Sequence, residues 1–280
     1  MLYDAHNHLQ DPWLTPHWDQ VVRDLKDIPL GRAVVNGTAE NDWAAVANLA
    51  RQHAFVLPSF GLHPWNVGNA ATGWRDALLA QLDAIRGSAI GEIGLDRWIL
   101  DHARPDDSRL SGLRRATLDE QMAAFRWQLT LAAERNLAVT IHSLEAWGPL
   151  LQALRESPLP ARGFLVHAYN GSIETAQELA ALGAYFSFNG YFLGLRHAAK
   201  RAMFASLPLE RLLVETDAPA MPLPSEFAAY SLPGLADGNP INHPGNIGAV
   251  YAGLARIRNL PLETLTNAVE ENFRRLFTTT

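Results

Sequence analysis

Several apolar runs in this chain end in a histidine or an acidic residue, the side-chain types that bind divalent metal ions. In the segment DAHNH at positions 4–8, the two-residue period of an extended strand puts Asp4, His6 and His8 on one face. Two imidazoles about 7 Å apart along a strand can bind one ion between them. A single buried histidine is usually a hydrogen-bonded core residue, but this spacing after an acidic residue predicts metal ligands.

Four more side chains of the same types follow later apolar runs. They are Glu92, His142, His167 and Asp217. A carboxylate at the end of a buried strand needs a compensating charge, which a metal ion supplies; an ion pair with an arginine such as Arg97 is the alternative. Each histidine by itself would fit a core position equally well. Their joint occurrence with His6 and His8 predicts one site with six ligands.

The composition limits the kinds of protein this can be. Its 280 residues are 48% hydrophobic, enough for one large core, and the net charge of -6 provides no overall positive field for nucleic acid. A cationic metal site can still attract an anionic substrate locally.

Without cysteine the chain has no disulfide, thiolate ligand or cysteine nucleophile. The first predicted strand begins at Leu2 and no apolar stretch reaches membrane-spanning length. We therefore expect a cytoplasmic protein without signal peptide or membrane association, and infer no protein partner.

Apolar, strand-like runs alternate with helix-like segments along the whole chain. The expected strands lie at 2–8, 32–36, 55–61, 88–94, 137–142, 163–167, 184–189 and 211–216. The expected helices lie at 17–26, 42–53, 74–86, 118–136, 145–156, 172–182, 196–206, 245–258 and 261–277. Eight such units predict an α/β fold, a closed (β/α)8 TIM barrel in which residues 1–280 form a single domain. The six ligands then lie at the carboxyl ends of strands, the face where barrel enzymes have their active sites.

Two segments that follow strands are longer than a barrel loop requires. Residues 97–116 carry mixed charge, and residues 220–244 contain five prolines. Both should lie on the catalytic face, where they either wall a pocket or form solvated insertions.

Several side chains near the same strand ends are candidates to contact substrate. In the segment GLHPW at 61–65, His63 is a seventh ligand, a donor to substrate or a turn histidine, and we favour substrate contact. Trp65 and Tyr169 offer aromatic faces for a base, although aromatic residues there are as often pocket walls. The remaining candidates are Trp98, Asn170, Asn189, Tyr191 and His243.

In matching order along the chain, these motifs resemble those of the TatD family of metal-dependent hydrolases. They are D-x-H-x-H from Asp4, G-L-H-P from Gly61, G-E-I-G-L-D from Gly91, I-H at His142, V-H-x-aromatic at His167 and E-T-D-A-P from Glu215. The likeness covers essentially the whole chain and implies a TIM barrel with two divalent metal ions. The ligands carried over by motif are His6, His8 and Asp217 for one ion and His142 and His167 for the other, with Glu92 as the bridge. By the same resemblance, His63 would contact substrate.

The resemblance also implies an activity, because members of the family are reported as deoxyribonucleases, often as 3′ exonucleases. Two motifs on the substrate side depart from the family pattern: H-C-F-S-G is HAYNG at 167–171, and arginine-asparagine-glutamate-proline is INHP at 241–244. The substrate is therefore DNA or a small phosphate or acyl compound. A small-molecule amide, ester or lactone hydrolase is the alternative function, and a non-catalytic metal-binding barrel is a third hypothesis.

Asp217 and Glu92 are the residues expected to act in catalysis. Two cations bridged by Glu92 would lower the pKa of a water molecule, and Asp217 could accept its proton and return it to the leaving group. The ligand types do not distinguish Zn²⁺, Mn²⁺, Mg²⁺, Ni²⁺ and Fe²⁺, although imidazoles suit Mg²⁺ least. Asp4, Asn7 and Asp96 are candidates to orient a ligand from outside the coordination shell.

Overall fold

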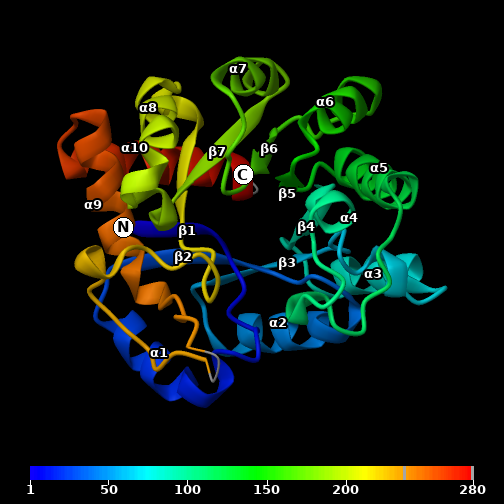
Figure 1. The fold of residues 1–280 in the computed structure, drawn as a ribbon, viewed down its shortest axis with the longest axis horizontal. Helices are drawn as coiled ribbons and strands as arrows, with labels where there is room; N and C mark the ends of the chain where they lie inside the picture. Colours follow the sequence, from blue (N-terminus) through cyan, green and yellow to red (C-terminus); the bar gives the residue numbers. More distant parts are fainter. Residues whose placement is uncertain (236–237, 279–280) are drawn as a thin grey trace.

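The computed structural model describes residues 1–235 and 238–278, and within them the predicted (β/α)8 barrel is confirmed (Figure 1). The strands are β1 (Leu2–Asn7), β2 (Leu30–Asn36), β3 (Val56–Phe60), β4 (Ala89–Asp96), β5 (Val139–Leu144), β6 (Phe164–Val166), β7 (Ala184–Asn189) and β8 (Leu212–Glu215). The helices are α1 (Trp18–Lys26), α2 (Glu40–Gln52), α3 (Trp74–Ala84), α4 (Trp98–Asp101), α5 (Leu118–Arg135), α6 (Trp147–Glu156), α7 (Ile173–Ala181), α8 (Ala198–Ser206), α9 (Ile247–Arg258) and α10 (Leu262–Phe277). The sequence did not predict α4, a single turn within 97–116.

The strands pair in sequence order as one parallel sheet, and β8 packs against β1, so that the barrel is nearly closed. Just beyond these two strands, the Asp217 N–H donates to the His6 carbonyl at 3.0 Å, and the His8 N–H donates to the Ala218 carbonyl at 2.8 Å. Asp217 has a φ of +54°, in the left-handed region that aspartate tolerates better than most residues. The closing seam therefore places three of the predicted ligands side by side.

Local sequence signals and the apolar core fix the frame that carries these ligands. α5 begins at the predicted capping box, in which Glu120 N–H donates to the Thr117 hydroxyl and Thr117 N–H donates to the Glu120 carboxylate, at 3.3 and 2.7 Å. Phe164 and Phe186, on neighbouring strands, are completely buried. α10 packs against both β1 and β8, on either side of the seam.

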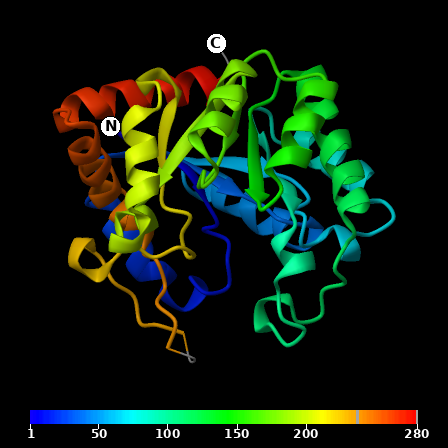
Figure 2. The same ribbon diagram turned by 45° about the horizontal axis from the view of Figure 1, so that its top comes forward.

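The segment 97–116 has a small apolar core of its own. Ile99, Ala103 and Leu110 are buried together, with Trp65 and Trp98 packed against them. A solvated insertion would not have this core, so the structure favours a wall beside the site. Figure 2 shows this segment (teal to green) projecting from the same end of the barrel as the 220–244 segment (yellow to orange), on the opposite side.

The described parts of 220–244 are tied to the start of α9. The Asn246 side-chain oxygen accepts the N–H groups of Ala229 and Tyr230, both at 2.9 Å. This segment therefore also forms an anchored wall. Among the described residues, no helix is both long and apolar enough to cross a membrane.

Candidate metal centre

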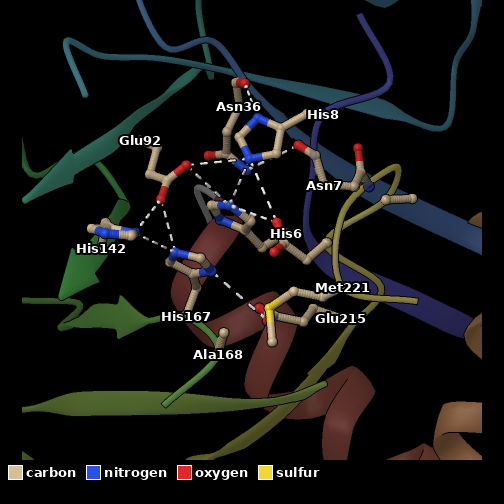
Figure 3. Close-up of polar contacts among 12 residues, drawn as sticks. His6, Asn7, His8, Asn36, Glu92, His142, His167, Ala168, Glu215 and Met221 are labelled. Carbon is tan, nitrogen blue, oxygen red and sulfur yellow. Dashed lines mark hydrogen bonds and ion pairs between the residues drawn. The ribbon is translucent and has the colours of Figure 1, made fainter. Parts of the chain in front are cut away.

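The six predicted ligands converge at the carboxyl ends of the strands, and Figure 3 shows five of them around a common centre. Their elements are β1 for His6, the residues after β1 for His8, β4 for Glu92, β5 for His142, the end of β6 for His167 and the end of β8 for Asp217. Glu92 is only 3% exposed, so its charge lies almost entirely among protein groups.

Four ligand atoms form a first compact group. The distances from His6 Nε2 are 3.2 Å to His8 Nε2, 3.5 Å to Glu92 Oε2 and 3.7 Å to Asp217 Oδ1. His8 Nε2 lies 3.2 Å from Glu92 Oε2 and 3.6 Å from Asp217 Oδ1. Ligand atoms about 2.1 Å from one ion at tetrahedral angles lie roughly 3.4 Å apart. The group therefore has the dimensions of a four-ligand metal site.

A second group gathers around the other oxygen of Glu92. Oε1 lies 3.0 Å from His142 Nδ1 and 2.8 Å from His167 Nε2, and these two nitrogens are 3.4 Å apart. Glu92 thus directs one oxygen to each group, which is the geometry of a bridging carboxylate. Three protein atoms leave coordination positions open, as a catalytic metal site requires.

Hydrogen bonds behind the rings set which nitrogen of a neutral imidazole has the lone pair. His8 Nδ1 lies 2.8 Å from the Asn36 carbonyl, which can only accept, so the proton is on Nδ1 and Nε2 can bind a cation. His142 Nε2 lies 3.0 Å from Asp96 Oδ2, which leaves Nδ1 free toward Glu92. Asp96 thus orients a ligand as predicted, whereas the carbonyl of Asn36 has no signature in the sequence.

His63 lies beside the second group but turns its protonated nitrogen, not its lone pair, toward Glu92. Its Nδ1 accepts the Trp65 N–H at 3.2 Å, so the neutral ring has its proton on Nε2, 3.4 Å from Glu92 Oε1. Burial lowers the pKa of His63 and keeps the ring neutral. A neutral N–H suits hydrogen bonding to substrate better than metal coordination, so this geometry favours the substrate-contact interpretation.

The electrostatics of the cluster follow from burial and from Glu92. Burial raises the pKa of Asp217 to about 7 and, with His167 nearby, holds the pKa of His6 well below its usual value. At His8, burial opposes protonation, but the Glu92 carboxylate outweighs it and raises the pKa to about 9. For Glu92, burial opposes ionisation, yet the surrounding histidines hold its pKa well below the usual range. Without a cation, protons on the histidines therefore balance the charge of Glu92.

Glu215 is a buried acid near the site to which we assigned no role from the sequence. It is completely buried, with Oε1 3.8 Å from His167 Nδ1, and accepts hydrogen bonds from the Ser187 hydroxyl and from Asn189 Nδ2. A gap of 3.8 Å exceeds a hydrogen bond, so Glu215 acts on His167 through its charge. The feature of the sequence that could have identified Glu215 is its position two residues before Asp217.

Two of the predicted substrate residues occupy structural positions instead. Tyr169 is completely buried against Trp147 and Phe186, because the chain turns at Ala168, with a φ of +42°, and sends the next side chain into the helix layer. Asn189 is also completely buried; its amide donates to Glu215 and to the carbonyl of Thr216, and its oxygen accepts the N–H of Tyr191. The structure therefore corrects both predictions of substrate contact.

His243 and Asp4 likewise hold the frame. His243 is completely buried, stacks on Tyr230 at 5.1 Å and lies 3.1 Å from Asp24, so it anchors the loop after β8 instead of facing substrate. The Asp4 carboxylate accepts the N–H and the hydroxyl of Thr216, at 3.0 and 2.6 Å, and so joins β1 to the end of β8. The side chain of Asn7 is buried without a hydrogen-bond partner in the protein and orients no ligand.

Trp65 and Asn170 remain half-buried at the edge of the site. The Trp65 indole N–H donates to Asp96 Oδ2 at 2.7 Å, and its ring stacks on Trp98 with centroids 6.2 Å apart. The Asn170 carbonyl accepts a hydrogen bond from Lys200. Trp65 therefore supports the oxygen that orients His142, and substrate contact by Trp65 and Asn170 stays a prediction.

Known proteins similar to this chain match it over nearly its whole length. A family model described as TatD related DNase matches residues 3–278. The uncharacterized metal-dependent hydrolase YjjV of Escherichia coli is 30% identical over 98% of this chain and 96% of its own. Human deoxyribonuclease TATDN3 is 27% identical over 99% of this chain and 94% of its own. The 3′-5′ ssDNA/RNA exonuclease TatD of Enterobacter lignolyticus is 27% identical over 99% of this chain and 98% of its own. The crystal structure of YjjV, a TatD homolog, has a TM-score of 0.83 at 27% identity, covering 100% of this chain and 98% of that one.

Proposed function

The chain belongs to the TatD family of metal-dependent hydrolases, and from that premise we propose that it removes nucleotides from the 3′ end of single-stranded nucleic acid. The observation that carries the proposal is Glu92, whose two oxygens face two separate groups of ligand atoms. Phosphodiester hydrolysis commonly uses two cations about 3.5–4 Å apart, and a bridging carboxylate holds such a pair.

The residues present fit two divalent cations. His6, His8 and Asp217 would hold the first, His142 and His167 the second, and Glu92 both. The imidazole-rich set suits Zn²⁺, Mn²⁺, Ni²⁺ or Fe²⁺ better than Mg²⁺ by ligand softness. When bound, the cations would supply hydroxide near neutral pH and neutralise the negative charge that develops on the phosphoryl oxygens.

The side chains around the two groups would have distinct tasks. Asp217 would accept the proton of the attacking water and return it to the leaving oxygen. The Nε2–H of His63 would donate to a phosphoryl oxygen of the substrate. Asp96 and Trp65 would keep His142 in its tautomer while substrate binds.

The test is cleavage of labelled single-stranded DNA by the protein loaded with Mn²⁺, Zn²⁺ or Mg²⁺. Label at the 5′ end should produce a ladder of shortening products, and label at the 3′ end should be released first as a mononucleotide. Glu92→Gln and His6→Ala should abolish both, with circular dichroism confirming that the variants fold. Cleavage that survives these substitutions would refute the proposal.

The departures at 167–171 and 241–244 motivate one alternative, an acyl hydrolase at the same site. Esters, lactones and amides should therefore be assayed beside the oligonucleotides with the same variants. Hydrolysis of these substrates that depends on Glu92, without cleavage of DNA or RNA, would replace the nuclease proposal. A fully metallated protein that hydrolyses neither set would identify a metal-binding barrel without catalysis.

A further inference from the structure

A hollow of about 430 Å³ lies between the segments that follow β7 and β8, at the carboxyl ends of these strands. Its lining includes Tyr191 and Arg196 from the segment between β7 and α8, and Pro222 from the segment after β8. Asn189 connects it to the site, because its side chain accepts the Tyr191 N–H at 2.9 Å and donates to Glu215 at 3.2 Å. Glu215 in turn lies 3.8 Å from His167, so a short chain of contacts links the edge of the hollow to the metal centre.

Three basic residues beside the hollow have no carboxylate partner among the described residues. Arg196 lies over the ring of Tyr191, with its guanidinium carbon 5.0 Å from the ring centroid, and hydrogen-bonds the Tyr191 hydroxyl and His197. Lys200 and Arg201 donate to backbone carbonyls. Burial lowers the pKa of His197, and these three cations lower it further, which is the effect of a local positive field.

On the opposite wall, formed by residues 97–116, most of the arginines are paired with carboxylates. The ion pairs there are Arg97–Asp101 at 2.7 Å, Arg104–Asp106 at 3.1 Å, Arg109–Asp107 at 2.6 Å and Arg114–Glu120 at 2.9 Å. Each of these four cations is neutralised by its own carboxylate. Arg115, the fifth arginine of that wall, donates to backbone carbonyls only. In a protein of net charge -6, three cations without a carboxylate partner among the described residues thus lie on the α8 side, against one on the opposite wall. A polyanion that reaches the metal centre should follow that side.

The hollow also has apolar and aromatic surface suited to a planar ring. Tyr191 is half-buried, and Leu195 beside it is 91% exposed. A single exposed leucine carries no meaning by itself. Next to a tyrosine and an unpaired arginine it completes the combination used for single strands, in which bases stack on aromatic rings and cations follow the phosphates.

We propose that this hollow is a nucleotide subsite for the single-stranded substrate, with Tyr191 and Leu195 contacting a base and Arg196 contacting a phosphate. The subsite rests on the proposed nuclease function and specifies the path of the strand, from the metal centre over the segment between β7 and α8. Glu226 also lines the hollow and is exposed, so it opposes the phosphate. Its neutral replacement should strengthen binding.

The first test measures binding without hydrolysis, by fluorescence anisotropy of a labelled single strand in EDTA at several salt concentrations. Arg196→Gln should weaken binding severalfold and reduce the slope of log K against log salt by about 0.7, the share of one phosphate contact. Arg196→Lys should keep the slope, and Glu226→Gln should tighten binding. The matched control is Arg104→Gln on the opposite wall, which should leave affinity and slope unchanged.

The aromatic contact is tested separately. Tyr191→Leu should weaken strand binding about 5- to 150-fold, the range for loss of one stacked base, while Tyr191→Phe should bind like the wild type. Equal affinity of Tyr191→Leu and the wild type, or equal effects of Arg196→Gln and Arg104→Gln, would overturn the subsite.

A kinetic test separates failure of the subsite from failure of the function. Arg196→Gln should raise KM for the oligonucleotide and leave hydrolysis of bis(p-nitrophenyl) phosphate, which is too small to reach the hollow, unchanged. A wild-type protein that cleaves oligonucleotides while Arg196→Gln matches it in KM and binding would refute the subsite alone. A wild-type protein that binds the strand through Arg196 and cleaves no phosphodiester would refute the nuclease function and support the subsite.

Discussion

At the scale of single residues, Glu92 determines what the site can do. A carboxylate buried among imidazoles is stable only with compensating positive charge, from protonated histidines or from cations. Its two oxygens face different groups of candidate ligand atoms, so this one side chain would bridge two bound cations. The residues behind the ligands, Asp96 and Asn36, decide whether each imidazole presents a lone pair or a proton.

Replacing Asp96 by asparagine should weaken the second metal site specifically. Asp96 Oδ2 accepts hydrogen bonds from both His142 and Trp65, and Oδ1 accepts one from the Ile99 N–H at 3.1 Å. In whichever orientation the asparagine amide is placed, its NH₂ group therefore faces at least one of these N–H donors. We expect a loss of about 10- to 100-fold in metal affinity at that site. Isothermal titration calorimetry measures it. Asp101→Asn, an exposed acid of the same segment, is the control, and two sites of wild-type affinity in Asp96→Asn would contradict the role of this carboxylate.

Metal binding should release protons and should weaken as pH falls. Glu92 and Asp96 raise the pKa values of His8 and His142 to about 9 against the effect of burial, so both rings are protonated at pH 7 when no cation is present. A cation must displace those protons, and its apparent affinity should therefore rise with pH between about 7 and 9. Calorimetry in buffers of different ionisation enthalpy counts the protons. Binding that is independent of pH over this range would show that the rings are already neutral.

At the scale of elements, β4 carries Glu92 with one glycine directly before it, Gly91, and another two residues after it, Gly94. A Cβ on Gly91 would lie 2.1 Å from the Thr140 hydroxyl, and one on Gly94 would lie 2.0 Å from the His142 carbonyl. The pairing of β4 with β5 is also irregular between Ile90 and Ile93. The glycines of the motif therefore set how closely β4 approaches β5, and with it the distance from Glu92 to His142.

Gly91→Ala should destabilise the protein and disturb the metal centre together. The overpacked methyl group should cost about 1–3 kcal/mol, and each kcal/mol lowers the Tm by roughly 2–4 °C in a chain of this size class. Gly148→Ala in α6 is the matched control, because a Cβ there meets no atom within 4 Å and its Tm should be unchanged or slightly higher. Calorimetry and metal analysis test both. An unaltered Tm and metal content in Gly91→Ala would show that β4 accommodates the methyl group.

At the scale of the whole molecule, the proposed ligands come from β1, β4, β5 and the ends of β6 and β8, so a bound cation joins strands from opposite sides of the barrel. The seam between β8 and β1 depends on a few bonds around Asp217 and Thr216. Cations held across it should stabilise the folded state, because the unfolded chain cannot assemble the same ligands.

Removal of the metal ions should lower the thermal stability of the entire barrel. At a free concentration one hundred times Kd, each site adds about 2.7 kcal/mol to the free energy of unfolding, equivalent to roughly 5–10 °C in Tm. Scanning calorimetry of metal-loaded protein with and without EDTA measures the difference. Glu92→Gln, which removes the bridge, should show a smaller difference than the wild type. Identical Tm values for loaded and chelated wild type would argue against binding at the seam.

The sequence by itself determined the architecture and the convergence of the six ligands. Strand and helix periodicities are local, and every predicted strand or helix boundary lies within two residues of the observed one. The short helix α4 was not predicted. Parallel strands present their carboxyl ends at one face, so residues at those ends had to meet there. Asp96 could be predicted to orient a ligand because it lies just after the strand expected at 88–94.

Only the tertiary structure decided how the surrounding side chains are used. Tyr169 and His243 were expected to face substrate, but the turn at Ala168 and the partners Tyr230 and Asp24 bury them. The tautomers of His8 and His142 also depend on non-local neighbours, the Asn36 carbonyl and Asp96, and whether Arg196 has a carboxylate partner among the described residues depends on which loops lie beside it. A ligand's position follows from strand geometry, which repeats along the chain, whereas burial and pairing depend on loops whose conformations no local period encodes.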